Sequence, residues 1–304
     1  MTSLRRMGLL LAAALAPLVV GVGAAPAQQL DPRQSRALYA DPQSLAAQQG
    51  DAYAAIGSQP QALWLTTSYS VDAVQGVTAD YVSRAAAAQR TPQVVLYAIP
   101  DLNCGGGGWP DATTYRAWVS RIAAALAGRG AIAIVEPDAL PFASTCGGSA
   151  RLSLLRWTVG TLAEAGVWAY LDAGHTHWQP AKRVARWLKR AGVARARGFA
   201  LNVANFQPTA ATKRYAAAVR RALAKRGVRA SHYVIDTSRN GARPRGTNWC
   251  NPTWARLGTA PRMFTSGALD GLLWVKHPGE TDGACHGGPA WGWSDLLADR
   301  LLGR

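Results

Sequence analysis

The sequence predicts an α/β fold in which seven parallel strands curl toward a distorted, TIM-like (β/α) barrel. Two observations support this prediction: short apolar runs alternate with amphipathic helical segments along the chain, and the apolar runs lack polar alternation. The chain has 304 residues, of which 49% are hydrophobic and 16% charged. This composition excludes disordered and collagen-like chains, and the length suffices to bury a substantial core.

Seven runs have the character of strands buried on both faces, because they are apolar throughout and rich in β-branched residues. These strand candidates are residues 63–65, 94–99, 131–135, 167–171, 198–203, 232–235 and 272–275.

Helical segments lie between most of these runs, with apolar residues at i, i+3 and i+4 and arginines between them. They span residues 78–90, 113–128, 150–165, 180–191 and 209–226. Repeated strand–helix alternation indicates a parallel sheet with crossover helices, and seven strands in one domain favour a barrel-like closure. An open, doubly wound sheet is the alternative.

Residues 1–27 have the pattern of a secretory signal peptide. Arg5 and Arg6 precede an apolar stretch from Gly8 to about Val22, and residues 25–27 (APA) form an A-x-A cleavage pattern. The apolar stretch is short for a membrane span of about 20 residues. We therefore expect a secreted protein without a membrane anchor after cleavage, with residues 28–304 forming one catalytic domain and acting as a monomer.

Lysine and arginine number 33 against 17 aspartates and glutamates, which gives a net charge of +16. Such an excess is also found in nucleic-acid and envelope-binding proteins. Many of the arginines, however, fall on predicted helices, as on solvated faces, and no nucleic-acid-binding motif accompanies them. We therefore expect no nucleic-acid partner, although the charge could draw the protein to an acidic polysaccharide or an anionic surface.

The four cysteines, Cys104, Cys146, Cys250 and Cys285, are an even number, which in an exported protein favours two disulfides. No pair has C-x-x-C spacing, so a zinc site is not expected. Three connectivities are possible. The in-order pairing is favoured because each bond would then clamp a glycine-bearing loop region.

Polar residues cluster directly after the strand candidates. In a parallel α/β fold the carboxyl ends of the strands meet at one rim, and chemistry is assembled there. Single Asp or Asn residues often only cap the next helix, but six clusters at one edge indicate a site. The clusters include residues 100–101, 136–138, 172–175, 202/205, 236–241 and 276–282.

The rim combines several carboxylates with aromatic residues. Crowded carboxylates cannot all ionise, so one is held neutral, as general acid catalysis of glycosidic bond hydrolysis requires. Aromatic rings can cover the apolar faces of sugars. No G-x-S-x-G elbow, Walker loop or G-x-G-x-x-G fingerprint is present. His175 and His177 could bind a metal, but a substrate contact by His175 is the preferred interpretation.

Taken together, the motifs resemble those of glycoside hydrolase family 6, secreted cellulases that act on β-1,4-glucan. The resemblance runs from about residue 39 to the C-terminus. The carrying motifs are residues 63–65, 95–100 with Cys104, 134–140 (IVEPDAL), 170–178 (YLDAGHTHW), 198–206 (GFALNVANF), 235–241 (IDTSRNG), 249–252 (WCNP) and 274–285 (WVKHPGETDGAC).

This resemblance implies a distorted parallel barrel, an inverting mechanism, the in-order disulfides and no metal or organic cofactor. It implies Asp138 as general acid, Asp172 as the neighbour that keeps the pKa of Asp138 raised, and Asp282 as base or charge-stabilising carboxylate. Tyr97 would assist distortion of the reacting sugar. The implied substrate-binding residues are Trp64, Trp178, Trp249, Lys276 and Glu280, to which the rim positions add His175, Asn202 and Asn205.

The sequence departs from the family pattern at several positions. Asn103 stands where the family has an aspartate on the proton path of the attacking water, and an amide cannot take up a proton. His277 replaces a usual proline, and no second tryptophan follows Trp178. The short segments 205–236 and 251–276 favour an open cleft and hence internal cleavage of a β-1,4-glucan. The alternative is a β-glucan-binding protein whose catalysis Asn103 has weakened or abolished.

Overall fold

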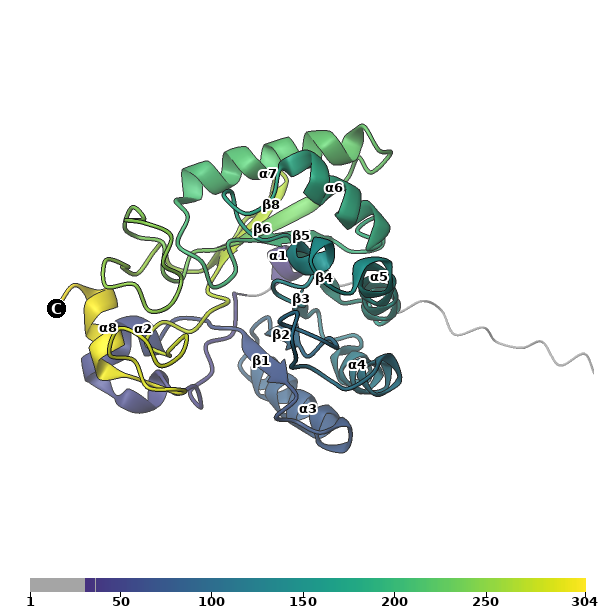
Figure 1. Ribbon diagram of the computed structural model, residues 1–304. Coiled ribbons are helices and arrows are strands. Elements are labelled where there is room, and N and C mark those ends of the chain that lie inside the picture. The colour runs from purple at the N-terminus through teal and green to yellow at the C-terminus, as the bar shows by residue number, and fades with distance from the viewer. Residues whose placement is uncertain (1–30, 36) are drawn as a thin grey trace, which may run out of the picture.

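The computed structural model describes residues 31–35 and 37–304, which build a curled sheet with helices packed around it (Figure 1). The predicted signal peptide lies outside the described residues. The sheet has eight strands in the order β1-β2-β3-β4-β5-β6-β8-β7. The strands are β1 (Leu63–Thr66), β2 (Gln93–Tyr97), β3 (Ile132–Val135), β4 (Trp168–Asp172), β5 (Gly198–Leu201), β6 (His232–Asp236), β7 (Arg262–Met263) and β8 (Leu269–Leu273).

The predicted parallel α/β architecture is confirmed, with two corrections. An eighth strand, the two-residue β7, pairs antiparallel with β8 at Leu272 and Gly271. The sheet is also a half-barrel rather than a closed barrel, because β1 and β7 are its edges and no ladder joins β1 to β8 in the described part of the chain. Closure is limited to isolated bonds, among them the Ala62 N–H to Trp274 carbonyl bond at 3.1 Å.

Most helices cover the outer face of the sheet, whereas the C-terminal helix and the short helix of residues 54–57 lie together beside it (Figure 1). The longer ones are α3 (Val71–Ala87), α4 (Ala112–Leu126), α5 (Gly148–Glu164), α6 (Ala181–Arg190), α7 (Thr209–Ala224) and α8 (Asp295–Leu302), and the short ones are α1 (Pro32–Ser35), α2 (Ala54–Gly57), η1 (Ala47–Gln49), η2 (Asp51–Tyr53) and η3 (Pro141–Ser144). Helix α3 begins seven residues before the predicted start because the Ser70 hydroxyl accepts a hydrogen bond from the Ala73 N–H. None of the helices in the described ranges is long and apolar enough to cross a membrane.

Strand residues alternate between two apolar layers, which explains why the sequence shows no polar alternation. Val94 and Leu96 of β2 pack toward the helices, whereas Val95 packs with Ile134 and Val234 on the inner face of the curl. Because side chains alternate with a period of two, polar side chains at the strand ends continue the row of inner-face residues. Tyr97, Asp172 and Asp236 each follow an inner-face residue by two positions.

The fully buried Asp236 ties three rim loops together. Its carboxylate accepts hydrogen bonds from the backbone N–H groups of Ala204 (2.9 Å), Ser238 (2.9 Å) and Lys276 (3.0 Å). These donors follow β5, β6 and β8, so one side chain fixes the relative positions of three neighbouring loops at the carboxyl edge of the sheet. The rim is therefore built as a connected unit.

Candidate active site

A cleft of about 1370 Å³ opens at the carboxyl edge of the sheet. Nine of the twelve residues that the sequence assigned to catalysis or substrate binding line it, namely Trp64, Tyr97, Asp138, His175, Trp178, Asn205, Trp249, Lys276 and Asp282. The other three, Asp172, Asn202 and Glu280, are not among its lining residues. The topology thus brings together side chains that lie more than 200 positions apart in the sequence.

Asp138, which lines the cleft, forms an acidic pair with the buried Asp172. The Asp138 backbone N–H donates to Asp172 Oδ2 at 2.9 Å, in a turn where Asp138 adopts a φ of 71°. Burial raises the pKa of both carboxyl groups, and the negative charge of Asp138 raises the pKa of Asp172 further. The pair therefore keeps a proton to a higher pH than an isolated aspartate would, and Asp138 presents that acidic group to the cleft.

Asp282 has the opposite electrostatic environment. Its Oδ2 accepts from Arg239 Nη1 at 2.7 Å and from the Asn251 backbone N–H at 3.1 Å, and Lys276 Nζ lies 3.5 Å from Oδ1. Burial acts to raise the pKa of Asp282, but the charges of Arg239 and Lys276 outweigh it and the pKa lies below its ordinary value. The cleft therefore holds one carboxyl group that tends to stay protonated and another that tends to stay ionised.

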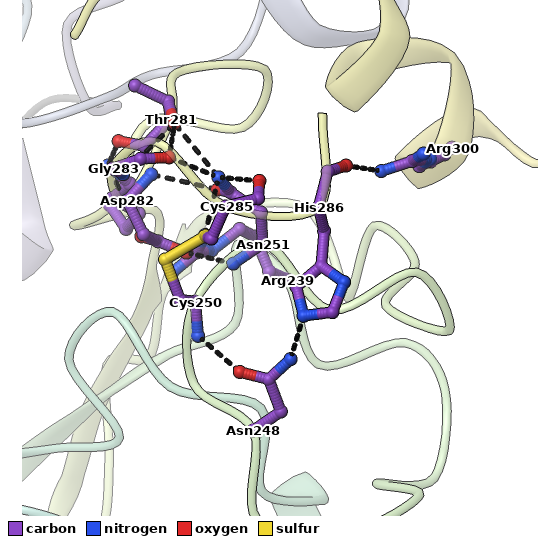
Figure 2. The surroundings of a disulfide bond; sticks show 11 residues. Arg239, Asn248, Cys250, Asn251, Thr281, Asp282, Gly283, Cys285, His286 and Arg300 are labelled. Atoms are coloured by element: carbon purple, nitrogen blue, oxygen red, sulfur yellow. Dashed lines mark hydrogen bonds and ion pairs between the residues drawn. A yellow bond between two sulfur atoms is a disulfide. The ribbon is translucent and has the colours of Figure 1, made fainter. Parts of the chain in front are cut away.

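Asn251, which sequence reasoning did not single out, holds the loop of Asp282 (Figure 2). Its Oδ1 accepts from the Asp282 backbone N–H at 2.8 Å, and its Nδ2 donates to Thr281 Oγ1 at 2.9 Å and to the Gly283 carbonyl at 2.8 Å. Together with its own backbone N–H, these bonds fix both the backbone and the carboxylate of Asp282. The only signal in the sequence was its place in the WCNP motif.

The cysteines pair in order, as favoured from the sequence. Cys250–Cys285 joins the Asn251 loop to the Asp282 loop, and Figure 2 shows the bond beside this hydrogen-bond network. Cys104–Cys146 joins the loop after β2 to the segment just before α5. The Arg151 guanidinium binds the Asp101 carbonyl in the same loop. Each disulfide therefore braces one side of the rim.

Aromatic side chains line much of the cleft. Trp64 and Tyr97 meet edge to face with ring centroids 5.3 Å apart, and Trp178 meets Phe142 in the same way at 5.0 Å. Trp249 is 63% exposed although it lines the cleft. Flat, partly exposed rings of this kind can stack on the apolar face of a ligand. Four further residues with aromatic rings line the cleft but were not predicted to bind substrate, namely Phe142, His177, Phe206 and Trp254.

The two remaining polar wall residues that were predicted, His175 and Asn205, are held by their neighbours. Burial lowers the pKa of His175 to about 4, so its ring is neutral near neutral pH. Since His175 Nδ1 accepts from the His177 backbone N–H at 3.4 Å, its Nε2 carries the proton and can donate. Asn205 Oδ1 accepts from the Phe206 backbone N–H at 2.9 Å.

Asn202, for which a substrate contact was predicted, lies outside the cleft lining. The residue is fully buried and its amide is used inside the protein: Nδ2 donates to the Asp236 carbonyl at 2.9 Å, and Oδ1 accepts from the Gln207 backbone N–H at 2.9 Å. It supports the loop that carries Asn205 instead of reaching the cleft. Buried position and saturated hydrogen bonding, which depend on the tertiary fold, are not visible in the sequence.

Glu280 lies outside the cleft lining and pairs with His277. His277 Nδ1 lies 2.9 Å from Glu280 Oε1, and His277 Nε2 lies 2.6 Å from the Ala62 carbonyl oxygen. Burial opposes ionisation of both groups, but their mutual attraction raises the pKa of His277 and lowers that of Glu280. Both ring nitrogens of His277 face acceptors, which favours its protonated form, and the ring links Glu280 to the segment before β1.

Asn103 lines the cleft on the loop between β2 and α4, one residue before the first disulfide. Gly108 of this loop has a φ of 76°, and a Cβ there would lie 1.9 Å from the Ile99 carbonyl oxygen, so the loop returns to β2 too closely for a side chain.

No group of three or more His, Cys, Asp or Glu residues is placed to hold a metal ion within residues 31–35 and 37–304.

The family profile described as Glycosyl hydrolases family 6 matches residues 27–293. The chain belongs to this family. Endoglucanase 1 of Streptomyces halstedii is 37% identical, over 92% of both chains. Endoglucanase A of Cellulomonas fimi is 40% identical over 80% of this chain, and Endoglucanase A of Thermobispora bispora is 38% identical over 93% of it. This chain spans only 54% and 66% of the lengths of those two relatives.

A solved structure of another family 6 protein agrees with the fold. The endoglucanase of Mycobacterium tuberculosis, in complex with methyl-cellobiosyl-4-deoxy-4-thio-β-D-cellobioside, superposes with a TM-score of 0.83 at 37% identity, covering 90% of this chain and 99% of that one. An enzyme of the same family from Orpinomyces gives a TM-score of 0.75 at 28% identity. The family membership expected from the motifs is thereby confirmed.

Proposed function

We propose that the protein is an inverting endo-β-1,4-glucanase that cleaves internal bonds of cellulose-like glucans. The observation that carries the proposal is the pairing of environments in one cleft: Asp138 has a raised pKa and Asp282 a lowered one. Glycosidases need this combination of a protonated and an ionised carboxyl group. The names of the relatives, which are endoglucanases, favour the same activity.

In the proposed reaction Asp138 donates its proton to the departing glycosidic oxygen. A water attacks the anomeric carbon from the opposite face of the sugar, which inverts its configuration and requires a gap of about 6.5–9.5 Å between the two carboxyl groups. Asp282, kept ionised by Arg239 and Lys276, stabilises the positive charge that develops on the sugar and can accept the proton of the water. Asp172 accepts a hydrogen bond from the Asp138 backbone N–H and so holds the turn that presents Asp138 to the cleft.

The substrate is a β-1,4-glucan chain lying along the aromatic residues of the cleft. We assign ring contacts to Trp64, Trp178 and Trp249 and hydroxyl contacts to His175 and Asn205. Burial raises the pKa of Tyr97, and the nearby carboxyl groups add to this, so its phenol stays protonated beside the reacting sugar. The glucan partner, a monomeric state and secretion through the N-terminal signal all belong to this proposal.

The test compares Asp138→Asn and Asp282→Asn with the parent protein on carboxymethyl-cellulose and cello-oligosaccharides, with NMR detection of the product anomer. We expect the α-anomer from the parent protein and a loss of turnover of at least about 10²-fold in each variant. Asp72→Asn, at an exposed carboxylate on α3, is the matched control. A β-anomeric product, or full activity of Asp138→Asn, would reject the proposal.

A second candidate function is a glucan-binding protein with weakened catalysis, which the presence of Asn103 in the cleft wall favours. An amide at this position can orient a water but cannot accept its proton. We expect Asn103→Asp to raise kcat and to change the pH profile, with little change in the affinity for cello-oligosaccharides. An unchanged kcat and pH profile in the variant would show that Asn103 does not limit the reaction.

A further inference from the structure

The net charge of the chain is concentrated in one segment. Residues 173–235 contain 14 lysines and arginines and no aspartate or glutamate, which leaves 19 lysines and arginines against 17 acidic residues in the rest of the chain. This segment comprises the loops around β5 together with helices α6 and α7. This segment therefore accounts for +14 of the net charge of +16.

Helices α6 and α7 lie next to each other on one side of the sheet, away from α3 and α4 (Figure 1). Val184, Trp187 and Leu188 face the interior, so the outward positions of α6 are left to cations. Lys182, Arg186 and Arg190 follow at i, i+4 and i+8, and Arg214, Arg221 and Lys225 form a second row along α7 and its end. We call the exposed cations of these two helices the α6–α7 basic face.

Most of the 14 cations in residues 173–235, including those of the basic face, are not neutralised by the protein. Of the 14 cations, Arg195 pairs with Glu164 at 2.7 Å and Arg197 with Asp270 at 2.8 Å. The other twelve form no ion pair with any carboxylate in residues 31–35 and 37–304, and ten of them are exposed. Like charges at i and i+4 destabilise a helix. The arrangement therefore costs stability that an anionic partner would restore.

We propose that the α6–α7 basic face binds an acidic polysaccharide that carries one carboxylate on each sugar. Cations four residues apart on a helix lie about 6 Å apart along its axis, so Lys182, Arg186 and Arg190 offer three evenly spaced carboxylate sites. The row on α7 has intervals of seven and four residues and adds further sites along the same side. Arginine binds carboxylates with two parallel hydrogen bonds, which suits a repeating carboxylate polymer.

Two other anionic partners fit less well. A bilayer surface is bound by helices that insert apolar side chains, but Trp187 and Leu188 are buried against the protein. Single-stranded nucleic acid is bound by cations interleaved with exposed aromatic rings, and the exposed positions of α6 carry none. A polymer that offers only charge is the partner that an all-cationic helical face fits.

The basic face also borders the cleft. Gln207, Pro208 and Ala211 line the cleft wall, and α7 begins at Thr209 within this segment. An acidic polysaccharide on α7 would therefore lie beside a glucan in the cleft. The binding is independent of the proposed catalysis, because none of the cations in the two rows lines the cleft.

The test measures binding of a fluorescent oligogalacturonate to the mature protein by anisotropy at low and at physiological salt. We expect binding that weakens steeply with salt. The variant Arg186→Gln, Arg190→Gln, Arg221→Gln should bind about tenfold more weakly, since three exposed ion pairs are lost. Glutamine preserves helix propensity at these positions.

The matched control removes the same charge elsewhere, with Arg90→Gln, Arg121→Gln and Arg129→Gln on and after α3 and α4. This variant should bind as the parent protein does at equal salt, apart from a small effect of net charge. Unchanged melting temperature and unchanged hydrolysis of neutral cello-oligosaccharides verify that both variants are folded. Absence of binding, equal weakening in the control, or tighter binding to duplex DNA or to anionic vesicles would overturn the proposal.

Discussion

Arg239 is the residue on which the charge of Asp282 depends most. Its side chain is 4% exposed, donates from Nη1 to Asp282 and from Nη2 to the Ala204 carbonyl at 2.8 Å, and lies over the Phe206 ring at 4.6 Å. The ring of Phe206 and the two hydrogen-bond acceptors together fix the position of the guanidinium. A buried carboxylate with such a partner stays ionised at a pH where a free aspartate would begin to protonate.

We predict that Arg239→Gln shifts the acid limb of the kcat/KM profile to higher pH. The lowered pKa of Asp282 rises when this cation is lost, so protonation of Asp282 ends activity earlier as the pH falls. The alkaline limb, set by the raised pKa of the Asp138–Asp172 pair, should stay in place. Arg239→Lys, which retains a cation, should shift the acid limb less. An unmoved acid limb in Arg239→Gln would separate Asp282 from the reaction.

At the scale of elements, the two disulfides brace different loops of the rim. Cys250–Cys285 links residues 35 positions apart beside Asp282, and Cys104–Cys146 links residues 42 positions apart beside Asn103. Because loops of similar length confer similar entropic stabilisation, the two bonds differ mainly in what they position. This makes each a control for the other.

We predict that removing either disulfide by double Cys→Ala substitution lowers the free energy of unfolding by about 2–5 kcal/mol. Removing Cys250–Cys285 should also lower kcat, since the Asn251 and Asp282 loops lose their covalent link. The measurements are urea denaturation and steady-state kinetics at a temperature where both variants are folded. If kcat stayed at the parent value, the hydrogen bonds of Asn251 alone would suffice to hold Asp282.

The elements also show what could be predicted from sequence. Long apolar runs and amphipathic helices were found because period and burial are local signals, whereas β7 has two residues and no period to detect. The carboxylates were found because they follow strands, and strand ends share a rim. Asn251 was missed as a positioning residue because its role lies in contacts 31 residues away, at Asp282. The buried position of Asn202 could not be predicted for the same reason, since only the fold reveals which rim side chains turn inward.

At the scale of the whole molecule, the half-barrel is closed by side chains where strand pairing stops. His277 joins Glu280 to the Ala62 carbonyl, and Trp64 Nε1 donates to the Val275 carbonyl at 2.7 Å. These bonds connect the segment around β1 to the segment after β8. This arrangement favours the protonated form of His277, so the connection depends on pH.

We predict that the stabilising effect of His277 is present below its ordinary pKa and is lost as the pH rises through its raised folded-state pKa. At the acid end, it is lost as the pH falls through the lowered pKa of Glu280. Within this window His277→Gln should lower the free energy of unfolding by about 1.5–3 kcal/mol. Melting temperatures measured across the pH range test this, with the exposed His177→Gln as control. A pH-independent difference would contradict a charged His277.

The open side of the sheet gives the substrate a mechanical role. Trp64 stands on the first strand, while Lys276 and Asp282 follow the last long one, and all three border the same cleft. A polymer that contacts both margins would bridge the gap where no strand pairing closes the half-barrel. A bound polymer would then reduce the relative motion of the two margins and hold the reactive groups more rigidly.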